Sequence, residues 1–224
     1  MSLKPMVCIP IMEKDPASLL KSSKRAIKFG ADILEIRIDV LENPNTEKLK
    51  SLLQEMGHKL IATNRMQAEG GFFEGSESER TEILLDVAEY SDFIDIELRT
   101  KDKYRSEVIE ASKSSIVSFH DFEKTPDLEE LLGIVFRERG LGDIAKFAVM
   151  PQNIQDTLTV LEVLSQVKDT IGISMGEIGR YTRVVAPLFG SPLTFASLDV
   201  ESAPGQLDIQ TTKKFLDELG NWRS

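Results

Sequence analysis

The chain contains eight short runs of apolar, mostly β-branched residues, and segments with helical periodicity separate them. Such alternation is typical of repeated βα units, in which helices cover a sheet of parallel strands. The count of eight, at roughly 28 residues per unit, predicts a single closed (β/α)8 TIM barrel. An open doubly wound sheet is the alternative, because a local pattern does not show closure. The predicted strands are residues 7–11, 33–39, 60–65, 93–98, 116–120, 144–150, 170–175 and 194–198.

The predicted helices follow the strands in alternation. Asp15 can cap the first of them. The segment after the seventh strand, near residues 181–187, predicts only a short helix. No linker or change of composition interrupts the pattern, so we expect one domain over residues 1–224. The remaining predicted helices are residues 16–29, 46–56, 79–90, 102–112, 128–139, 154–167 and 210–219.

Charge and cysteine content narrow the class of protein. A net charge of -10 repels polyanions, which argues against nucleic acid and anionic membrane surfaces as partners. A small anionic substrate stays possible if a few arginines converge in one pocket. No apolar stretch approaches the ~18 residues that span a bilayer, and no signal segment is seen, so we expect a cytoplasmic protein. The single cysteine, Cys8, lies in an apolar run, which favours a buried side chain over a reactive thiol.

Polar residues occur near the ends of the apolar strands, where barrel enzymes place their catalytic groups. Glu35 and Arg37 are two residues apart and therefore lie on one face of their strand. They form either a structural ion pair or part of a site. For Asp95 and Glu97, neutralisation of nearby cations is the favoured interpretation. Other candidates at strand ends are Arg65, Glu69, His120 and Met175, and two loops rich in small residues, 67–78 and 200–206, follow strands as active-site loops do.

Lys146 lies within an apolar strand, where an unpaired ammonium is costly. Such a setting lowers the pKa of a lysine and favours the neutral amine, which can attack a ketone and form an imine. A lysine that reaches solvent from the strand end is the alternative. His120 ends the strand before that of Lys146, so it is either a general acid/base or a structural histidine. Two isolated histidines and one cysteine provide no zinc ligand set, and we expect no metal.

Several motifs, in order along the chain, resemble those of the type I 3-dehydroquinate dehydratases. The resemblance extends from the second strand almost to the C-terminus. It implies a (β/α)8 barrel, usually dimeric, that converts 3-dehydroquinate to 3-dehydroshikimate in the shikimate pathway without a cofactor or metal. The motifs are Leu34-Glu35-Ile36-Arg37-Ile38-Asp39, Arg65 with Glu69-Gly70-Gly71, Ser118-Phe119-His120-Asp121-Phe122, Lys146-Phe147-Ala148-Val149-Met150-Pro151 and Ser202-Ala203-Pro204-Gly205-Gln206.

The resemblance also implies a role for each residue. Lys146 would form the imine, His120 would be the general acid/base, and Glu69 would position His120. Pro10 stands near the place where bacterial members have a serine, which puts one substrate contact in doubt. The implied substrate-binding residues are Arg183 for the carboxylate, Glu35, Arg37 and Arg65 for the hydroxyls, Ser202, Ala203 and Gln206 in the lid, and Met175 and Phe195 as apolar walls.

Two other functions fit parts of the pattern. A class I aldolase for phosphorylated sugars would also use a lysine imine, but it predicts a phosphate site of backbone amides after the last strands. This chain has Arg183 and Ser-Ala-Pro-Gly-Gln there. A non-catalytic barrel that binds carboxylates would keep the arginines without needing Lys146 or His120.

Overall fold

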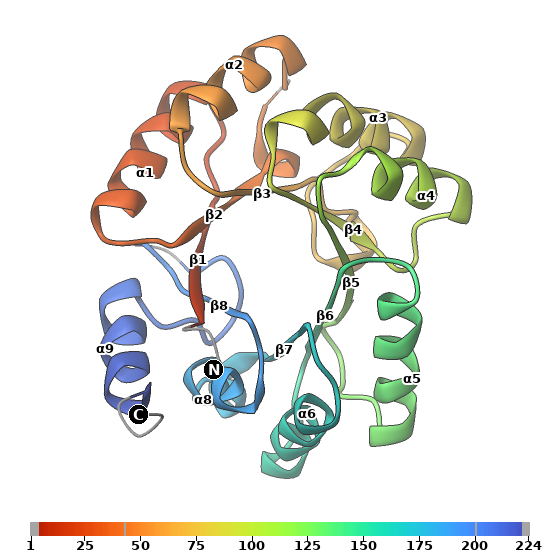
Figure 1. Ribbon diagram of the computed structural model, residues 1–224, viewed down its shortest axis with the longest axis vertical. Helices are drawn as coiled ribbons and strands as arrows, with labels where there is room; N and C mark the ends of the chain where they lie inside the picture. The colour runs from red at the N-terminus through yellow and green to blue at the C-terminus, as the bar shows by residue number, and fades with distance from the viewer. Residues whose placement is uncertain (1–4, 43, 200, 221–224) are drawn as a thin grey trace.

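Eight parallel strands form one sheet in the computed structural model, which describes residues 5–42, 44–199 and 201–220. Strands adjacent in sequence are paired from β1 to β7, and β8 returns to pair with β1. A doubly wound sheet does not bring the first and last strands together in this way, so the fold is the predicted (β/α)8 TIM barrel (Figure 1). The strands are β1 (Met6–Ile11), β2 (Ile33–Arg37), β3 (Leu60–Thr63), β4 (Phe93–Glu97), β5 (Ser115–Asp121), β6 (Ile144–Val149), β7 (Thr170–Ser174) and β8 (Leu193–Phe195).

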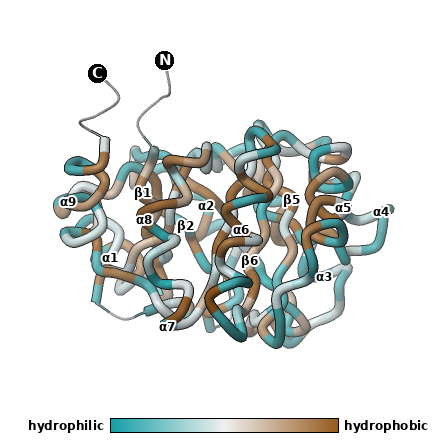
Figure 2. The backbone as a smooth tube through the Cα atoms, turned by 90° about the horizontal axis from the view of Figure 1, so that it is seen from below, coloured by the Kyte–Doolittle hydropathy of each residue, from teal (hydrophilic) through white to brown (hydrophobic). Residues whose placement is uncertain are grey.

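Helices surround the strands and cover the outer face of the sheet (Figures 1 and 2). The α-helices are α1 (Pro16–Lys28), α2 (Thr46–Met56), α3 (Glu77–Val87), α4 (Asp102–Ala111), α5 (Leu128–Arg139), α6 (Ile154–Gln166), α7 (Gly176–Gly179), α8 (Thr182–Val185) and α9 (Ile209–Gly220). The 3-10 helices are η1 (Ile38–Val40), η2 (Gln67–Glu69), η3 (Ala88–Tyr90) and η4 (Ala186–Phe189). Because α7 directly follows β7, its place at the lower edge in Figure 2 marks the end of the barrel where the strands finish.

Local chemistry explains where several elements begin and end. Asp15 caps α1 as predicted, since its side chain accepts hydrogen bonds from the backbone N–H groups of Ala17 and Ser18. Helix α3 begins two residues before the predicted start, because Ser76 and Glu79 form a capping box at its N-terminus.

Every strand differs from its predicted bounds by at least one residue, and three strands end two or three residues before the predicted end. β2 stops at Arg37 where η1 begins, β3 stops at Thr63, and β8 covers only Leu193–Phe195. Residues 38–39 therefore belong to η1, and residues 64–65 belong to the loop after β3, rather than to strands. Val200, the first residue of one predicted loop, lies outside the described residues.

The barrel interior is apolar near the beginning of the strands and polar near the end where the strands finish. Cys8, Ile33, Ile61 and Ile116 are fully buried together, and burial raises the pKa of the Cys8 thiol, so this cysteine is a core residue as predicted. Two residues farther along several strands, the inward positions become polar, as at Glu35, Thr63, Asp95 and Ser118. Because side chains alternate between the two faces of a strand, these inward positions form a polar layer next to the apolar layer, on the side where the strands finish.

The strands β7 and β8 are not joined by backbone pairing in the part of the chain that the structure describes. We call this gap the seam. Helices α7 and α8, followed by η4, connect the two strands, and α8 lies against both (Figure 1). The Thr194 hydroxyl donates to the backbone carbonyl of Arg183, with a distance of 2.6 Å, which attaches α8 to β8. Among residues 5–42, 44–199 and 201–220, no helix is both long and apolar enough to cross a membrane.

Candidate active site

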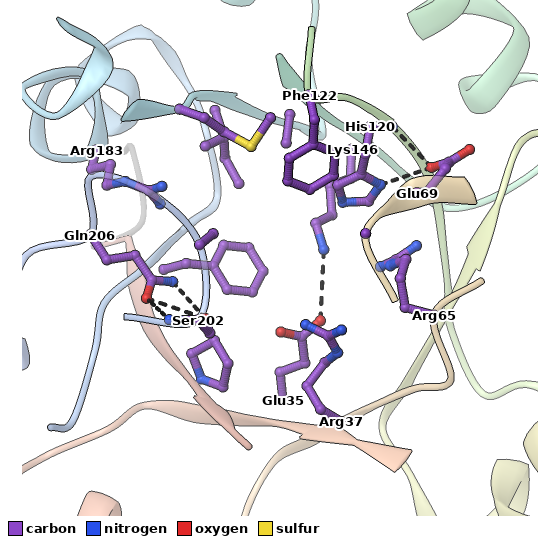
Figure 3. Close-up of a pocket in the computed structure, with 17 residues that line it drawn as sticks. Glu35, Arg37, Arg65, Glu69, His120, Phe122, Lys146, Arg183, Ser202 and Gln206 are labelled. Carbon is purple, nitrogen blue, oxygen red and sulfur yellow. Dashed lines mark hydrogen bonds and ion pairs between the residues drawn. The ribbon is translucent and has the colours of Figure 1, made fainter. Parts of the chain in front are cut away.

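A pocket opens at the end of the barrel where the strands finish (Figure 3). All twelve residues that the sequence singled out as catalytic or substrate-binding line it. They are Glu35, Arg37, Arg65, Glu69, His120, Lys146, Met175, Arg183, Phe195, Ser202, Ala203 and Gln206. Pro10, Gly70, Phe122, Ala148 and Ile173 complete the lining.

Lys146 rises from β6 into the centre of the pocket and is buried (Figure 3). Its Nζ donates to Asp95 Oδ2 at 2.8 Å and lies 3.7 Å from Glu35 Oε1. The same nitrogen stands 4.7 Å from the centroid of the Phe195 ring. The prediction of an unpaired amine among apolar neighbours is therefore wrong. Asp95 and Glu35 lie on strands that are distant in sequence, but both meet Lys146 inside the barrel. The alternative of a lysine that reaches solvent is wrong for this structure.

Asp95 is the centre of a buried ionic network beneath the pocket. Its Oδ1 accepts from Ser118 Oγ at 2.6 Å and lies 2.7 Å from Nη2 of Arg65, while its other oxygen binds Lys146. Burial alone would raise the pKa of Asp95, but Arg65 and Lys146 more than offset it and hold that pKa well below its usual range. Glu97 pairs with Arg65 and Arg80 at 3.1 and 2.7 Å. Both carboxylates therefore neutralise cations, as the favoured interpretation predicted.

His120 and Glu69 form a second buried pair. One oxygen of Glu69, Oε2, lies 2.9 Å from both the backbone nitrogen and Nδ1 of His120 (Figure 3). Burial lowers the pKa of His120 well below 6.5, and the nearby Arg65 and Lys146 lower it further. The ring is therefore neutral near pH 7. With Nδ1–H donating to Glu69, Nε2 is left free to accept a proton.

A sharp turn brings Glu69 to His120. Residues 67–69 form η2, and the chain then passes so close to Arg65 that a Cβ on Gly71 would stand 2.0 Å from the Arg65 carbonyl oxygen. Only glycine fits at this point. The Glu69-Gly70-Gly71 motif thus has a steric reason, and the Phe122 ring packs over Gly70 at the rim of the pocket.

The predicted alternative of an ion pair between Glu35 and Arg37 is wrong. Arg37 instead makes two parallel hydrogen bonds to Asp39, at 2.9 and 2.7 Å, because the chain turns into η1 directly after β2. Glu35 accepts a hydrogen bond of 2.8 Å from the Thr63 hydroxyl and faces Lys146. Both side chains still line the pocket, as their spacing of two residues predicted.

Arg183 in α8 is a buried guanidinium without a carboxylate partner among the described residues. Its Nη2 donates to the Pro204 carbonyl at 2.8 Å, and its Nε has no hydrogen-bond partner in the same set. Burial lowers the pKa of Arg183 to about 10; the Glu201 carboxylate acts against this change, and the neighbouring Arg180 adds to it. An anion entering the pocket would supply the missing charge and acceptors.

The loop after residue 200 covers the side of the pocket next to Arg183. Ser202 and Gln206 hold each other, with Ser202 N 2.8 Å from Gln206 Oε1 and Gln206 Nε2 2.9 Å from the Ser202 hydroxyl oxygen (Figure 3). Gly205 has φ +76°, and a Cβ there would stand 2.2 Å from the Gly176 carbonyl oxygen. The loop therefore rests directly on the turn that follows β7.

Apolar residues complete the walls, and some of them were missed by sequence reasoning. Met175 and Phe195 line the pocket as expected, with Ala203 above them. Ile173 and Ala148 also line it and could have been found, because each is two residues from a predicted site residue on the same strand. The other histidine, His58, does not line the pocket, and its Nε2 lies 3.0 Å from the Ala31 carbonyl oxygen. In the described chain, no group of three or more His, Cys, Asp and Glu side chains is arranged to hold a metal ion.

The chain was compared with known proteins. The model of the family described as type I 3-dehydroquinase matches residues 7–222. The chain belongs to this family. A 3-dehydroquinate dehydratase of Methanothermobacter thermautotrophicus is 51% identical over 213 residues, covering 95% of this chain and 96% of the relative. The relative from Methanobrevibacter smithii, also a 3-dehydroquinate dehydratase, is 46% identical over 94% of each chain.

Solved structures agree with this assignment. The type I 3-dehydroquinate dehydratase of Clostridium difficile superposes with a TM-score of 0.90 at 32% identity, over 97% of this chain and 93% of the other. The Geobacillus kaustophilus 3-dehydroquinate dehydratase gives a TM-score of 0.91 at 28% identity, over 98% and 93%. Membership of the type I 3-dehydroquinases decides against the sugar-phosphate aldolase and the non-catalytic barrel.

Proposed function

We propose that this type I 3-dehydroquinase removes water from 3-dehydroquinate through an imine on Lys146, with His120 moving the protons and Glu69 positioning His120. The product is 3-dehydroshikimate. One observation carries the assignment of roles: Lys146 and the His120–Glu69 pair, from strands and loops far apart in sequence, meet in one buried pocket. The Clostridium difficile relative was solved with covalent modified comenic acid, which supports covalent chemistry in this family.

The reaction begins when the Lys146 ammonium, paired with Asp95 and Glu35, releases one proton and its nitrogen attacks the substrate ketone. That proton is taken up again as water leaves, which gives a protonated imine that draws electrons from the adjacent carbon and makes its proton acidic. His120 Nε2 removes that proton, because the neutral imidazole has a free nitrogen while Nδ1–H is held by Glu69. The resulting imidazolium then donates a proton to the departing hydroxyl, and hydrolysis of the imine frees Lys146 and the product.

The polar lining provides the binding groups for the rest of the substrate. Arg183 binds the substrate carboxylate, since its guanidinium is buried and has no carboxylate partner within the described residues. Glu35, Arg37 and Arg65 bind substrate hydroxyls, and the lid residues Ser202 and Gln206 close the pocket. The sequence of these steps requires no metal or cofactor.

Three broader properties belong to the same proposal. The chain forms a single domain, works in the cytoplasm and assembles as a homodimer. Exposed apolar side chains support self-association: Ile154 and Leu158 stand one turn apart on α6, and Ile178 lies on the adjacent α7. Sedimentation of the purified protein would show a mass near twice 25.1 kDa if the dimer forms.

Borohydride trapping tests the imine. Incubation with 3-dehydroquinate and borohydride should add a reduced adduct to the peptide that contains Lys146, detected by mass spectrometry. Lys146→Gln should abolish this adduct, while the control Lys101→Gln, which changes an exposed lysine, should keep it. No adduct, or an adduct on another lysine, would refute the mechanism.

Replacement of His120 tests the second role. His120→Asn should still form the adduct on Lys146, but dehydration should slow by roughly two to four orders of magnitude, the usual loss when a general acid/base is removed. Turnover at the normal rate would exclude His120 from proton transfer.

A further inference from the structure

The two oxygens of Glu69 have different partners. Oε2 accepts a hydrogen bond from the backbone N–H of His120 and is also hydrogen-bonded to Nδ1 of the same residue. Oε1 is buried and has no hydrogen-bond partner in the described chain, yet Nε of Arg99 lies 3.7 Å from it. A guanidinium thus faces the side of Glu69 that points away from His120.

Arg99 stands outside the substrate pocket. It follows β4 by two residues, its side chain is 49% exposed, and it is not part of the pocket lining. Its guanidinium carbon lies 5.0 Å from the centroid of the Phe119 ring, on the strand that carries His120. Within the described residues, its one ion pair is with Glu69. Arg99 therefore does not line the substrate pocket, and its ion pair connects it to the reaction through Glu69.

Charged groups from four elements surround Glu69. Arg65 after β3, Glu97 on β4 and His120 on β5 face it together with Arg99, and Glu138 on α5 is close enough to interact electrostatically. Arg65 is already engaged by Asp95, Glu97 and Ser118. Arg99 is the cation near Glu69 that the buried network does not use.

We propose that Arg99 is a positioning residue that favours the ionised form of Glu69 and turns its Oε2 toward His120, and thereby sets the pH range in which His120 works. This inference rests on the proposed roles of His120 and Glu69. Burial raises the pKa of Glu69 to about 8, with Arg65 and Arg99 acting against it. Because the pKa of Glu69 lies near neutral pH, one neighbouring cation changes the fraction of Glu69 that is ionised. An ordinary surface carboxyl would already be ionised at that pH.

Two variants of Arg99 test the idea through the pH dependence of kcat. Arg99→Gln should move the acid limb to higher pH by roughly 0.2–0.7 unit, the shift that corresponds to a partly exposed ion pair. On that limb kcat should fall by up to about fivefold, while KM and the rate at high pH stay unchanged. Arg99→Lys keeps the charge and should restore most of the profile. The control Arg137→Gln, which removes an exposed arginine on α5, should leave the profile unaltered.

The possible outcomes separate this inference from the proposed function. An equal loss of kcat at every pH, an unmoved acid limb, or no rescue by Arg99→Lys would overturn the role of Arg99. If borohydride still labels Lys146 in those variants, the imine mechanism stands and only the role of Arg99 fails. If the unmodified protein gives no adduct on Lys146, the proposed function fails instead.

Discussion

Asp95→Asn removes the charge at the centre of the buried network while keeping the shape of the side chain. In the native protein, Asp95 lies within 2.8 Å of three donors, on Arg65, Ser118 and Lys146. The variant leaves two buried cations with fewer counter-charges. We therefore expect Asp95→Asn to fold but to be considerably less stable.

The expected loss of stability in Asp95→Asn depends on the ion pairs that Arg65 and Lys146 keep. Removing one partner of a buried ion pair costs about 3–5 kcal/mol. Arg65 keeps Glu97 at 3.1 Å and Lys146 keeps Glu35 at 3.7 Å, so we expect the lower end, about 3 kcal/mol. At about 2–4 °C per kcal/mol for a chain of this length, Tm should fall by roughly 6–12 °C.

Thermal unfolding followed by circular dichroism measures this change. The pKa of Asp95 is held below its ordinary value of 3.8, so its contribution is complete above that pH and is lost as the pH falls below it. The Tm difference between the native protein and Asp95→Asn should thus be largest at neutral pH and shrink in acid. Ser118→Ala is the matched control, since it removes two hydrogen bonds, one to Asp95 and one from Arg65, without removing a charge, at about 1 kcal/mol each. A Tm within 2 °C of the native value at pH 7, roughly the resolution of the assay, would refute the argument that the pairing stabilises the barrel.

Three further changes probe separate features. Glu138 is fully buried with neither oxygen hydrogen-bonded in the described chain, and burial raises its pKa, so native stability should fall with rising pH above 4.5 by up to about 1.4 kcal/mol per unit. Glu138→Gln should remove this slope, and parallel Tm curves from pH 5 to 8 would contradict the reasoning. Arg183→Lys should raise KM for 3-dehydroquinate by roughly 10–100-fold, because one charge-assisted hydrogen bond of about 1.5–3 kcal/mol is lost, and an unchanged KM would exclude carboxylate binding there. Gly205→Ala should lower kcat/KM at least about tenfold by displacing the lid, whereas Gly190→Ala, also at positive φ but with no atom within 4 Å of the added Cβ, should not.

The strand pattern predicted most of the fold because each strand carries its own signal. Apolar runs marked the eight strands, and positions two residues apart correctly placed Glu35 and Arg37 on the inner face. Glu69, in η2 after β3, and His120, near the end of β5, were identified through their place in the pattern and through family resemblance. Their convergence on one pocket then follows from the barrel.

Pairings across the barrel could not be predicted in the same way. The partner of Lys146 is Asp95, 51 residues earlier, and only the closed sheet brings them together. Arg37 binds Asp39 rather than Glu35 because β2 ends two residues earlier than its apolar pattern suggests. Arg99 carried no signal in the sequence, since its contact with Glu69 joins the turn after β4 to η2 after β3.

The seam between β7 and β8 gives the barrel two strand edges that face each other. An uncovered edge offers free backbone N–H and C=O groups to strands of other chains, which is a common route to aggregation. Here α8 lies against both strands and, with α7 and η4, occupies the stretch between them. Since α8 also carries Arg183, one short segment both covers the strand edges and holds the cation that we propose binds the substrate carboxylate. Loosening it to admit a larger substrate would therefore cost the protein its resistance to aggregation.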